Sequence, residues 1–269
     1  MALVRGSTRV TLIIGHPIAQ VISPALFNQR FAELGLDSVM IPVDVVPDRL
    51  PDFLRLLRGW ENADGCVVTI PHKRSVVGDL DELTDRARRL RAVNVIRRTP
   101  DSRLSGDNVD GFGFLNAAAA HGFDPRGRSA LVIGSGGAGS AIADALCDSG
   151  IQHLTITDVD SGQAAWLASV LRTAFPSVDL AISVNGDLGR FDLVVNASPT
   201  GMGGIDELPI AASAIATIRS DVLVADVVTK PALTPFLRLA RQGGRTIQQG
   251  PETAAGQTEL LGRFMECLP

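Results

Sequence analysis

Hydrophobic and polar positions form two kinds of pattern along the chain: short apolar, β-branched runs and longer stretches with helical periodicity. The apolar runs predict strands at Val10–Ile14, Ser38–Val43, Cys66–Ile70, Val93–Arg97, Ala130–Ile133, Leu154–Thr157, Asp179–Ile182, Leu193–Asn196 and Val222–Asp226. The helical patterns between them include Pro47–Arg58, Val109–Ala120, Gly139–Ser149 and Ser161–Thr173. Strands that alternate with helices are typical of a parallel α/β fold.

The strands fall into two sets, which predicts two domains. The first set ends near Asp110, where a single helix leads into the turn-rich segment 121–129, and the second set begins at Ala130. A helical pattern from about Gly250 to Pro269 has no strand after it, so we expect it to pack on the first domain. We therefore assign residues 1–110 with 247–269 to one domain and residues 111–246 to the other.

Composition narrows the class of protein. A chain of 269 residues allows one large domain or two modest ones, and a hydrophobic content of 45% is ordinary for a globular protein. A net charge of −4 argues against nucleic acid or an anionic membrane as partner. No apolar run reaches the length of a membrane span or of a signal-peptide core, so we expect a cytoplasmic protein.

Cysteine and histidine spacing gives no sign of a metal site or a disulfide. Cys66, Cys147 and Cys267 form no CxxC pair, and we expect them to be reduced and packed in the interior. No His, Cys and Asp cluster has metal-ligand spacing, so we expect no metal. The basic run Arg86, Arg88, Arg89 and Arg91 is interpreted as a solvated helix face.

A glycine motif lies between the predicted strand Ala130–Ile133 and the following helix. Its glycines, Gly134, Gly136 and Gly139, have the spacing G-x-G-x-x-G, which allows a tight turn, close approach of a pyrophosphate and close packing of helix on strand. The next strand ends in Asp158, at the distance expected for a carboxylate that accepts ribose hydroxyls. Because no Lys or Arg lies nearby to hold a 2′-phosphate, the motif favours NAD over NADP.

Polar groups also follow the strands of the first domain. They occur in Gly15–Pro24, in Val67–Lys73, at Asn94 and in Gly106–Gly111, each beside a predicted strand end, where open α/β sheets hold ligands. Together they suit a polyhydroxylated small molecule. Lys73 and Asp110 could move a proton, provided that partial burial lowers the pKa of the lysine.

These segments, in this order, resemble the shikimate and quinate dehydrogenase family over the full length of the chain. Gly15–Pro24 resembles the family's G-x-P-I-x-x-S-x-S-P pattern, Val67–Lys73 its N-V-T-x-P-x-K pattern, and Gly106–Gly111 its G-D-N-T-D-G pattern. Asn196–Met202 is similar to the family's N-A-T-x-x-G-M segment. The resemblance implies two α/β domains separated by a cleft, an N-terminal substrate-binding domain and a Rossmann-type dinucleotide-binding domain.

The resemblance also implies the roles of individual residues in a hydride transfer between a ring hydroxyl and nicotinamide. Lys73 would take the hydroxyl proton and Asp110 would orient the lysine. The substrate-binding positions would be Ser23, Thr69, Asn94, Thr229 and Gln257. The cofactor-binding positions would be Gly134, Gly136, Gly137, Ala138, Gly139, Asp158, Ser198, Val227 and Gly250. The segment Asp158–Asp160 resembles the NAD-preferring members.

The chain departs from the family pattern at the end that binds the substrate carboxylate. Val21 replaces a serine of the S-x-S pair, and Thr229 takes the place of a tyrosine. Val67 and Val109 also replace polar residues. Loss of a hydrogen bond to a carboxylate costs about 1.5–3 kcal/mol. Three alternatives therefore remain: shikimate or quinate as substrate, the same chemistry on another cyclic or polyol substrate, and a non-catalytic NAD sensor. The chain would act on a small molecule as a monomer or homodimer.

Overall fold

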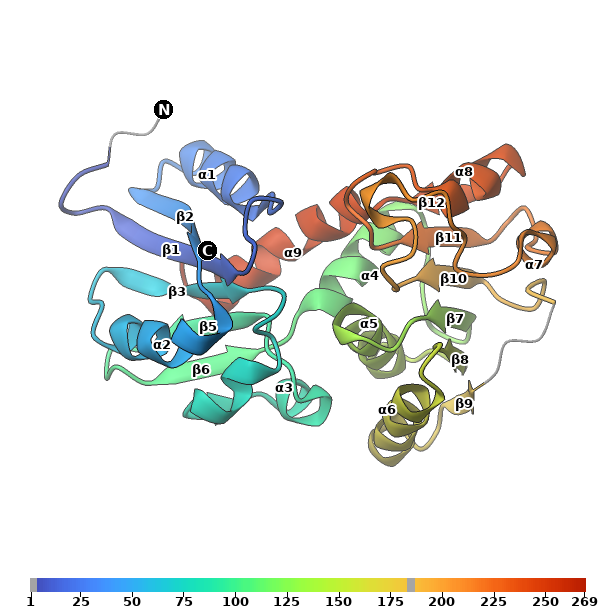
Figure 1. Cartoon of the computed structure of the whole chain (residues 1–269), viewed down its shortest axis with the longest axis horizontal. Coiled ribbons are helices and arrows are strands. Elements are labelled where there is room, and N and C mark those ends of the chain that lie inside the picture. Colours follow the sequence, from blue (N-terminus) through green and yellow to red (C-terminus); the bar gives the residue numbers. More distant parts are fainter. Residues whose placement is uncertain (1–3, 183–186) are drawn as a thin grey trace. The chain divides into compact units, whose positions relative to one another are not determined.

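The computed structural model describes residues 4–182 and 187–269. The chain forms two compact units, unit 1 with residues 1–109 and 257–269, and unit 2 with residues 110–256 (Figure 1). Each unit contains a six-stranded sheet among the described residues. Both units are thus α/β, as the alternating pattern predicts.

The second boundary between the units lies at Gln257, whereas the sequence pattern placed it at residue 247. Strand β12 (Thr246–Gln248) pairs in parallel with β11 (Leu223–Asp226), so it extends the sheet of unit 2. Gln248 is fully buried and donates to the carbonyl of Phe114, which also belongs to unit 2. Residues 247–256 therefore belong to unit 2, and the prediction for them was wrong.

The strands of unit 1 have the spatial order β2-β1-β3-β5-β6-β4, and Figure 1 labels all of them except β4. They are β1 (Arg9–Gly15), β2 (Ser38–Asp44), β3 (Ala63–Val68), β4 (Glu82–Leu83), β5 (Val95–Arg98) and β6 (Leu104–Asp107). The pairs β1–β2, β1–β3 and β4–β6 are parallel, but β3–β5 and β5–β6 are antiparallel. The connection from Arg98 to Leu104 is a short turn, too short for the crossover that a parallel pair requires. The sheet is therefore mixed.

The sequence prediction misplaced the end of β3 and missed β6, and both differences affect the polar motif segments. β3 begins at Ala63 and ends at Val68, so Thr69 and Ile70 leave the sheet and belong to the following turn. β6 has the sequence Leu-Ser-Gly-Asp, which lacks the β-branched residues that identify strands, and the sequence pattern missed it. Both corrections place polar motif residues at strand ends.

Helices cover both faces of the unit 1 sheet. They are α1 (Ser23–Glu33), α2 (Leu50–Arg58), α3 (Asp85–Leu90) and the C-terminal part of α9 (Gly250–Phe264). Leu12 and Ile14 of β1 belong to one apolar cluster, with Leu54 of α2. Ile13 between them belongs to another, with Phe27 of α1 and Leu261 of α9. This alternation shows that the strand is buried on both faces.

The strands of unit 2 have the order β12-β11-β10-β7-β8-β9, and every neighbouring pair is parallel. The remaining strands are β7 (Ser129–Ile133), β8 (His153–Thr157), β9 (Asp179–Ile182) and β10 (Leu193–Asn196). Numbered from β7, this is the order three-two-one-four-five-six of a Rossmann fold. The chain reverses direction across the sheet between β7 and β10, and the ends of these two strands form the point where such folds bind ligands.

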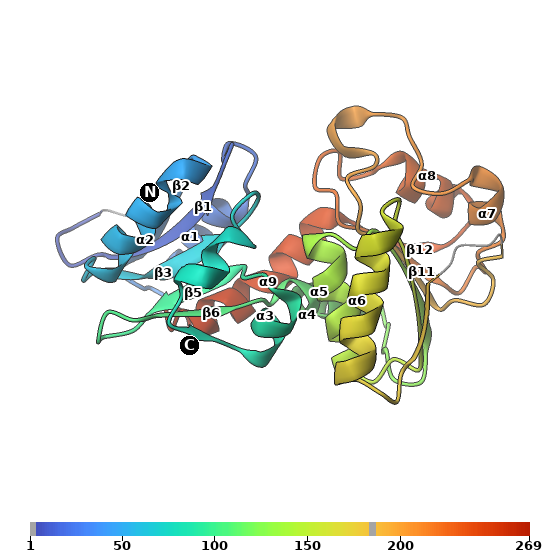
Figure 2. The same cartoon turned by 60° about the horizontal axis from the view of Figure 1, so that its bottom comes forward.

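Helices also lie on both sides of the unit 2 sheet (Figure 2). One side carries α5 (Gly137–Asp148) and α6 (Ser161–Ala174), and the other carries α7 (Ala212–Ala216) and α8 (Pro235–Gln242). α4 (Asp110–Ala120) packs against α5, and a Cβ on Gly111 would lie only 2.0 Å from the Ala141 carbonyl oxygen. Only glycine therefore allows the two helices to approach this closely.

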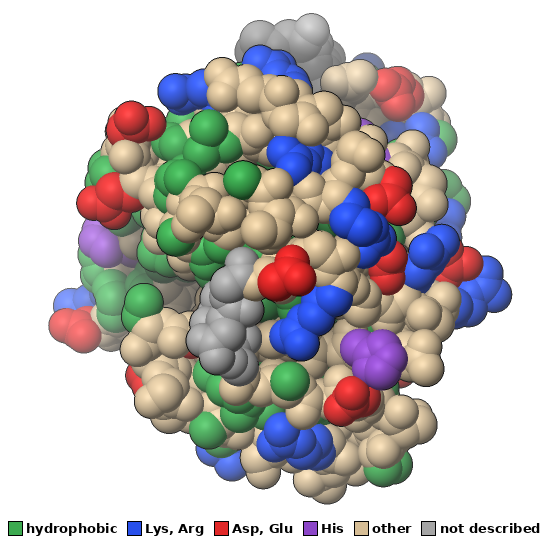
Figure 3. Space-filling view, turned by 90° about the vertical axis from the view of Figure 1, so that its right-hand side faces the viewer, with side chains coloured by type: hydrophobic (Ala, Val, Ile, Leu, Met, Phe, Trp, Pro, Cys, Tyr) green, Lys and Arg blue, Asp and Glu red, His purple; other side chains and the backbone are tan. Residues whose placement is uncertain are grey.

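Residues 4–182 and 187–269 contain no helix that is long and apolar enough to cross a membrane, and no group of three His, Cys, Asp or Glu side chains that could hold a metal ion. All three cysteines are buried and unbridged, and burial raises the pKa of the Cys267 thiol to about 12. On the face shown in Figure 3, Lys and Arg side chains are interspersed with Asp and Glu.

Candidate functional site

Two polar segments of unit 1 lie together because they follow neighbouring strands. β1 and β3 are parallel, and beyond their ends the Thr69 N–H donates to the Ile14 carbonyl at 2.9 Å. The His16 N–H donates to the Ile70 carbonyl at 3.0 Å. A Cβ on Gly15 would lie 2.6 Å from the Thr69 side chain, so glycine is required here. The motif segments 15–24 and 67–73 therefore share one end of the sheet.

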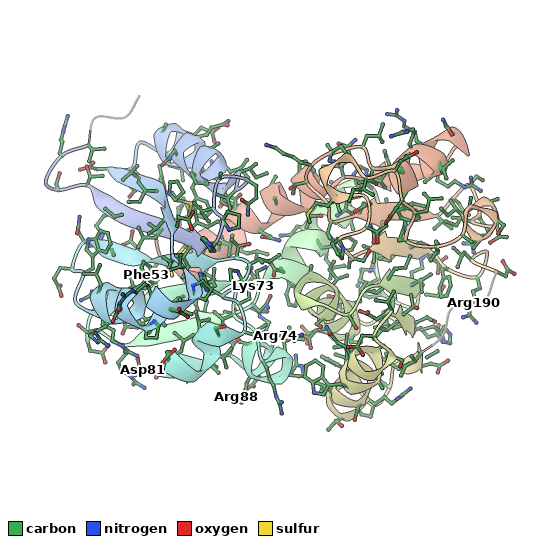
Figure 4. The ribbon with its side chains drawn as sticks, in the orientation of Figure 1. Phe53, Lys73, Arg74, Asp81, Arg88 and Arg190 are labelled. Atoms are coloured by element: carbon green, nitrogen blue, oxygen red, sulfur yellow. The ribbon has the colours of Figure 1, made fainter. Side chains whose placement is uncertain are left out.

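Lys73 follows the turn after β3 and is half-buried (Figure 4). Its carbonyl accepts a hydrogen bond of 2.7 Å from the Val93 N–H, the residue before Asn94. This bond ties the lysine backbone to the start of β5. The neighbouring Arg74 is exposed.

Asn94 links this segment to the start of α4. Its buried side-chain oxygen accepts a hydrogen bond of 2.8 Å from the Val109 N–H, and Val109 immediately precedes Asp110. Asp110 is also buried, as the first residue of α4. A backbone hydrogen bond thus connects Lys73 to the residue before Asn94, and the Asn94 side chain connects to the residue before Asp110.

The segment that carries Asp110 is anchored by an ion pair that the sequence did not suggest. Arg86 donates from Nε (2.7 Å) and Nη2 (2.5 Å) to the two carboxylate oxygens of Asp107, which is buried. The Thr84 hydroxyl and the Asn108 N–H also donate to Asp107, at 2.5 and 2.7 Å. The interpretation of Arg86 as part of a solvated face was therefore wrong. The sequence carried no signal for this pair, because β6, the strand that ends in Asp107, was not recognised as a strand.

The departures from the family pattern fall in two environments. Val67 and Val109 are buried in the apolar cluster that contains Phe27, so they act as core residues. Val21 is half-buried and packs against the same cluster from the loop before α1. Ser23 begins α1 and is half-buried, so its hydroxyl is the remaining polar group of the S-x-S pair.

Two other predicted substrate residues lie in different units. Gln257 is half-buried on α9 and is the first residue of its unit 1 part. Thr229 is half-buried in unit 2, shortly after the end of β11. Nothing in either position contradicts the predicted role, and the roles remain predictions.

The two histidines beside the motifs are engaged within unit 1. His16 is exposed and its Nδ1 lies 2.7 Å from Asp44 Oδ1. His72 is buried, and its Nε2 lies 2.7 Å from the Val45 carbonyl oxygen, so Nε2 carries the proton. Both side chains are thus engaged with partners outside the proposed proton-transfer pair.

In unit 2 the glycine loop has the shape that a dinucleotide requires. Gly134 has a φ of +98°, and a Cβ there would lie 2.9 Å from the Ser198 nitrogen. A Cβ on Gly139 would lie 1.9 Å from the Gly134 carbonyl oxygen, so α5 packs tightly on the turn. Gly136 and Gly137, in contrast, face open space at the N-terminus of α5. The loop therefore leaves room for a pyrophosphate beside free helix N–H groups.

Asp158 lies next to this loop and is held by it. Its Oδ2 accepts from the Ser135 N–H at 2.5 Å and from the Ser135 hydroxyl at 2.7 Å. Its Oδ1 accepts from the Asp160 N–H at 2.9 Å. Partial burial raises the pKa of Asp158, but these hydrogen bonds outweigh it and hold the pKa below its ordinary value. The carboxylate is therefore ionised at neutral pH.

The other predicted cofactor residues border the same end of the sheet. Ser198 adjoins the glycine turn, as its distance from a Cβ on Gly134 shows. The Val227 N–H donates to the Asn196 carbonyl at 3.0 Å. A Cβ on Gly250 would lie 2.7 Å from the Val227 carbonyl oxygen, so the start of α9 packs on this segment. Ala138 is half-buried within the first turn of α5.

A buried polar network supports the ends of β10 and β11. The Asp226 carboxylate accepts from Asn196 Nδ2 (3.1 Å), the Thr234 hydroxyl (2.7 Å) and the Val228 N–H (3.0 Å). Burial raises the pKa of Asp226, and the three hydrogen bonds oppose this rise. Sequence reasoning assigned these residues no role. The sequence shows only that Asn196 and Asp226 each end a predicted strand, and their direct pairing follows from the register of β10 and β11.

The sequence of this chain is similar to those of known proteins. A family model described as the shikimate dehydrogenase substrate binding domain matches residues 13–96. The shikimate dehydrogenase (NADP(+)) of Rubrobacter xylanophilus is 38% identical over 246 residues, which is 89% of this chain and 84% of that protein.

Two solved structures share the fold over nearly the whole chain. The shikimate 5-dehydrogenase of Listeria monocytogenes, in complex with shikimate and NAD, has a TM-score of 0.90 and 25% identity, and covers 99% of this chain and 94% of that chain. The 5-ketofructose reductase of Gluconobacter sp. has a TM-score of 0.88 and 27% identity, with 96% and 92% covered.

Proposed function

The chain belongs to the shikimate dehydrogenase family, and we propose that it interconverts a ring hydroxyl and the corresponding ketone with a nicotinamide dinucleotide as hydride carrier. The observation that carries this proposal is the backbone linkage of Lys73 to Val93 and of the Asn94 side chain to Val109. These bonds connect the chain at Lys73, Asn94 and Asp110, and this supports a site with an amine, an amide and a carboxylate, a set that suits a carbinol from which a proton must be removed.

In the proposed reaction, the dinucleotide supplies the hydride acceptor for oxidation and the donor for reduction. In oxidation, Lys73 takes the proton of the reacting hydroxyl. The carbon that bears this hydroxyl loses its hydrogen as hydride, and its C–O single bond becomes a carbonyl. Asp110 orients the lysine ammonium that forms. Thr69, Asn94 and Gln257 bind the other hydroxyls of the substrate, and Ser23 and Thr229 bind its carboxylate.

The preferred cofactor is NAD in this proposal. Asp158, ionised and fixed beside the glycine loop, would accept the ribose hydroxyls and repel a 2′-phosphate. No Lys or Arg occurs in the sequence from Ser129 to Leu171, which spans the glycine loop and most of α6. The Rubrobacter relative is named for NADP(+), so this preference rests on the residues of this chain.

The preferred substrate is shikimate or quinate, and a second candidate is a keto sugar or polyol without a carboxyl group. Val21 favours the second candidate because it offers an apolar side chain where the family offers a hydroxyl. The likeness to a 5-ketofructose reductase favours it as well, since 5-ketofructose has no carboxylate. Oxidoreduction of a carbinol is common to both.

One assay separates these proposals. The purified protein is incubated with NAD or NADP and shikimate or quinate, and separately with NADH or NADPH and 5-ketofructose, while the reduced dinucleotide is followed by absorbance. Saturable turnover of shikimate or quinate supports the first candidate. Turnover of 5-ketofructose alone supports the second. Dinucleotide binding without any turnover would overturn both and favour a sensor.

A further inference from the structure

Ser135 occupies the position between the first two glycines of the loop and is fully buried. Its hydroxyl and its backbone N–H both donate to one oxygen of Asp158, Oδ2. A serine hydroxyl is not needed for the glycine turn itself, because the turn depends on backbone freedom at Gly134. The hydroxyl therefore acts on Asp158.

Ser135 is itself held in place by the two helices that follow β7 and β8. Its carbonyl accepts from the Ser140 hydroxyl of α5 at 2.8 Å and from Gln163 Nε2 of α6 at 2.7 Å. Both the N–H and the carbonyl of Ser135 are thus hydrogen-bonded, and the side chain donates its hydroxyl to the carboxylate from a fixed position.

The hydrogen bonds to Asp158 approach both of its oxygens. Oδ2 receives the two donors of Ser135, and Oδ1 receives the Asp160 N–H. Donors on both oxygens define the plane of the carboxylate. Without the hydroxyl, Oδ2 would lose one of its two donors, and the orientation of the carboxylate would be held less firmly.

We propose that Ser135 is a positioning residue for cofactor choice: its hydroxyl orients the Asp158 carboxylate so that it accepts the adenosine ribose hydroxyls of NAD and excludes the 2′-phosphate of NADP. This inference rests on the proposed role of Asp158. It assigns the selectivity to a pair of residues, one in the glycine loop and one at the end of β8.

The test uses Ser135→Ala, which keeps the backbone N–H and removes only the hydroxyl. We expect the KM for NAD to rise about 5- to 20-fold, because the charge-assisted contact between Asp158 and the ribose hydroxyls is weakened. We expect kcat with NAD to stay within about twofold, because the ribose contact binds the ground state and the transition state equally. The KM for NADP should not rise. A parallel loss in kcat for both dinucleotides would mean a general structural role and would overturn the inference.

Ser129→Ala is the matched control. It removes a hydroxyl at the start of β7, the strand that leads into the loop, and that hydroxyl bonds to the Arg190 carbonyl and to Asp192, not to Ser135 or Asp158. Its ratio of NAD to NADP affinity should stay within about twofold of wild type, whereas Ser135→Ala should lower that ratio about 5- to 20-fold. Equal ratios in the two variants would contradict the proposal.

A double-mutant cycle with Asp158→Ala identifies the partner of Ser135. NAD binding is measured by titration calorimetry on the protein without substrate, so the result does not depend on turnover. Ser135→Ala should weaken NAD binding in the wild-type background and leave it unchanged in the Asp158→Ala background. The same loss in both backgrounds overturns the inference. Tighter binding of NADP than NAD by the wild type overturns the proposed cofactor preference, and the cycle still reports the coupling.

Discussion

The side-chain oxygen of Asn94 holds the backbone N–H of Val109 at 2.8 Å, one residue before Asp110. The Asp107 carbonyl in turn accepts a hydrogen bond of 2.9 Å from the Asn94 N–H, so Asn94 bonds to residues before and after Asn108. Because Lys73 is tied to the residue before Asn94, the proposed proton acceptor and its orienting carboxylate share a common backbone support.

Lys73→Ala should lower kcat by about 10²- to 10⁴-fold, the usual contribution of a general acid–base group. The dissociation constant for NAD should stay within about twofold, because the dinucleotide loop lies in unit 2. Steady-state kinetics and titration calorimetry measure the two quantities. Arg74→Ala is the control, since Arg74 is the exposed neighbour in Figure 4 and should leave kcat unchanged. Near wild-type turnover by Lys73→Ala would refute the mechanism.

Asp158→Ala should narrow the preference for NAD over NADP by about 10-fold or more, since a charge-assisted hydrogen bond to ribose is lost and the repulsion of a 2′-phosphate disappears. The comparison of kcat/KM for the two dinucleotides measures this change. An unchanged ratio would mean that Asp158 does not face the ribose.

Val21→Ser should raise kcat/KM for shikimate by about 10-fold if a carboxylate binds beside Ser23, because the new hydroxyl donates to a charged group. Val21→Ala is the matched control, since it removes the same apolar contact without adding a donor. An increase with alanine as large as that with serine would show that space, and not the hydroxyl, limits the substrate.

Arg86→Ala should lower the free energy of unfolding by about 1.5–3 kcal/mol, because it leaves the buried Asp107 carboxylate without its charged partner. Arg88→Ala removes a pair between exposed residues, Arg88 and Asp85, and should cost at most about 1 kcal/mol. Urea unfolding of both variants measures the difference. Equal effects would mean that the Arg86–Asp107 pair behaves as a surface pair.

The raised pKa of Asp226 predicts that the free energy of unfolding depends on pH. Burial raises its pKa in the folded protein above the unfolded value, so its contribution to stability is present at low pH and is lost as the pH rises through the folded pKa. The stability advantage of the wild type over Asp226→Asn should therefore shrink as the pH rises from below about 4 toward neutrality. Denaturant unfolding at a series of pH values tests this, and an advantage that grows with pH would contradict it.

The sequence by itself determined the local parts of the protein. The glycine spacing 134–139 and the apolar run before it are sufficient to predict β7, the turn and α5, because the turn needs glycine and the parallel strand is buried on both faces. The place of Asp158 at the end of the next strand follows from the same local pattern. The motif segments of the first half likewise identified which strand ends carry polar groups.

The tertiary structure decided what depends on residues far apart in the chain. The antiparallel pairing of β3 and β5 and the addition of β12 to the second sheet arise from strand neighbours that no local pattern encodes. The pairs Arg86–Asp107 and Asn196–Asp226 join residues 21 and 30 positions apart. Buried polar groups select such partners because an unpaired one costs more free energy than a local preference supplies, and only the packed fold shows which groups become buried.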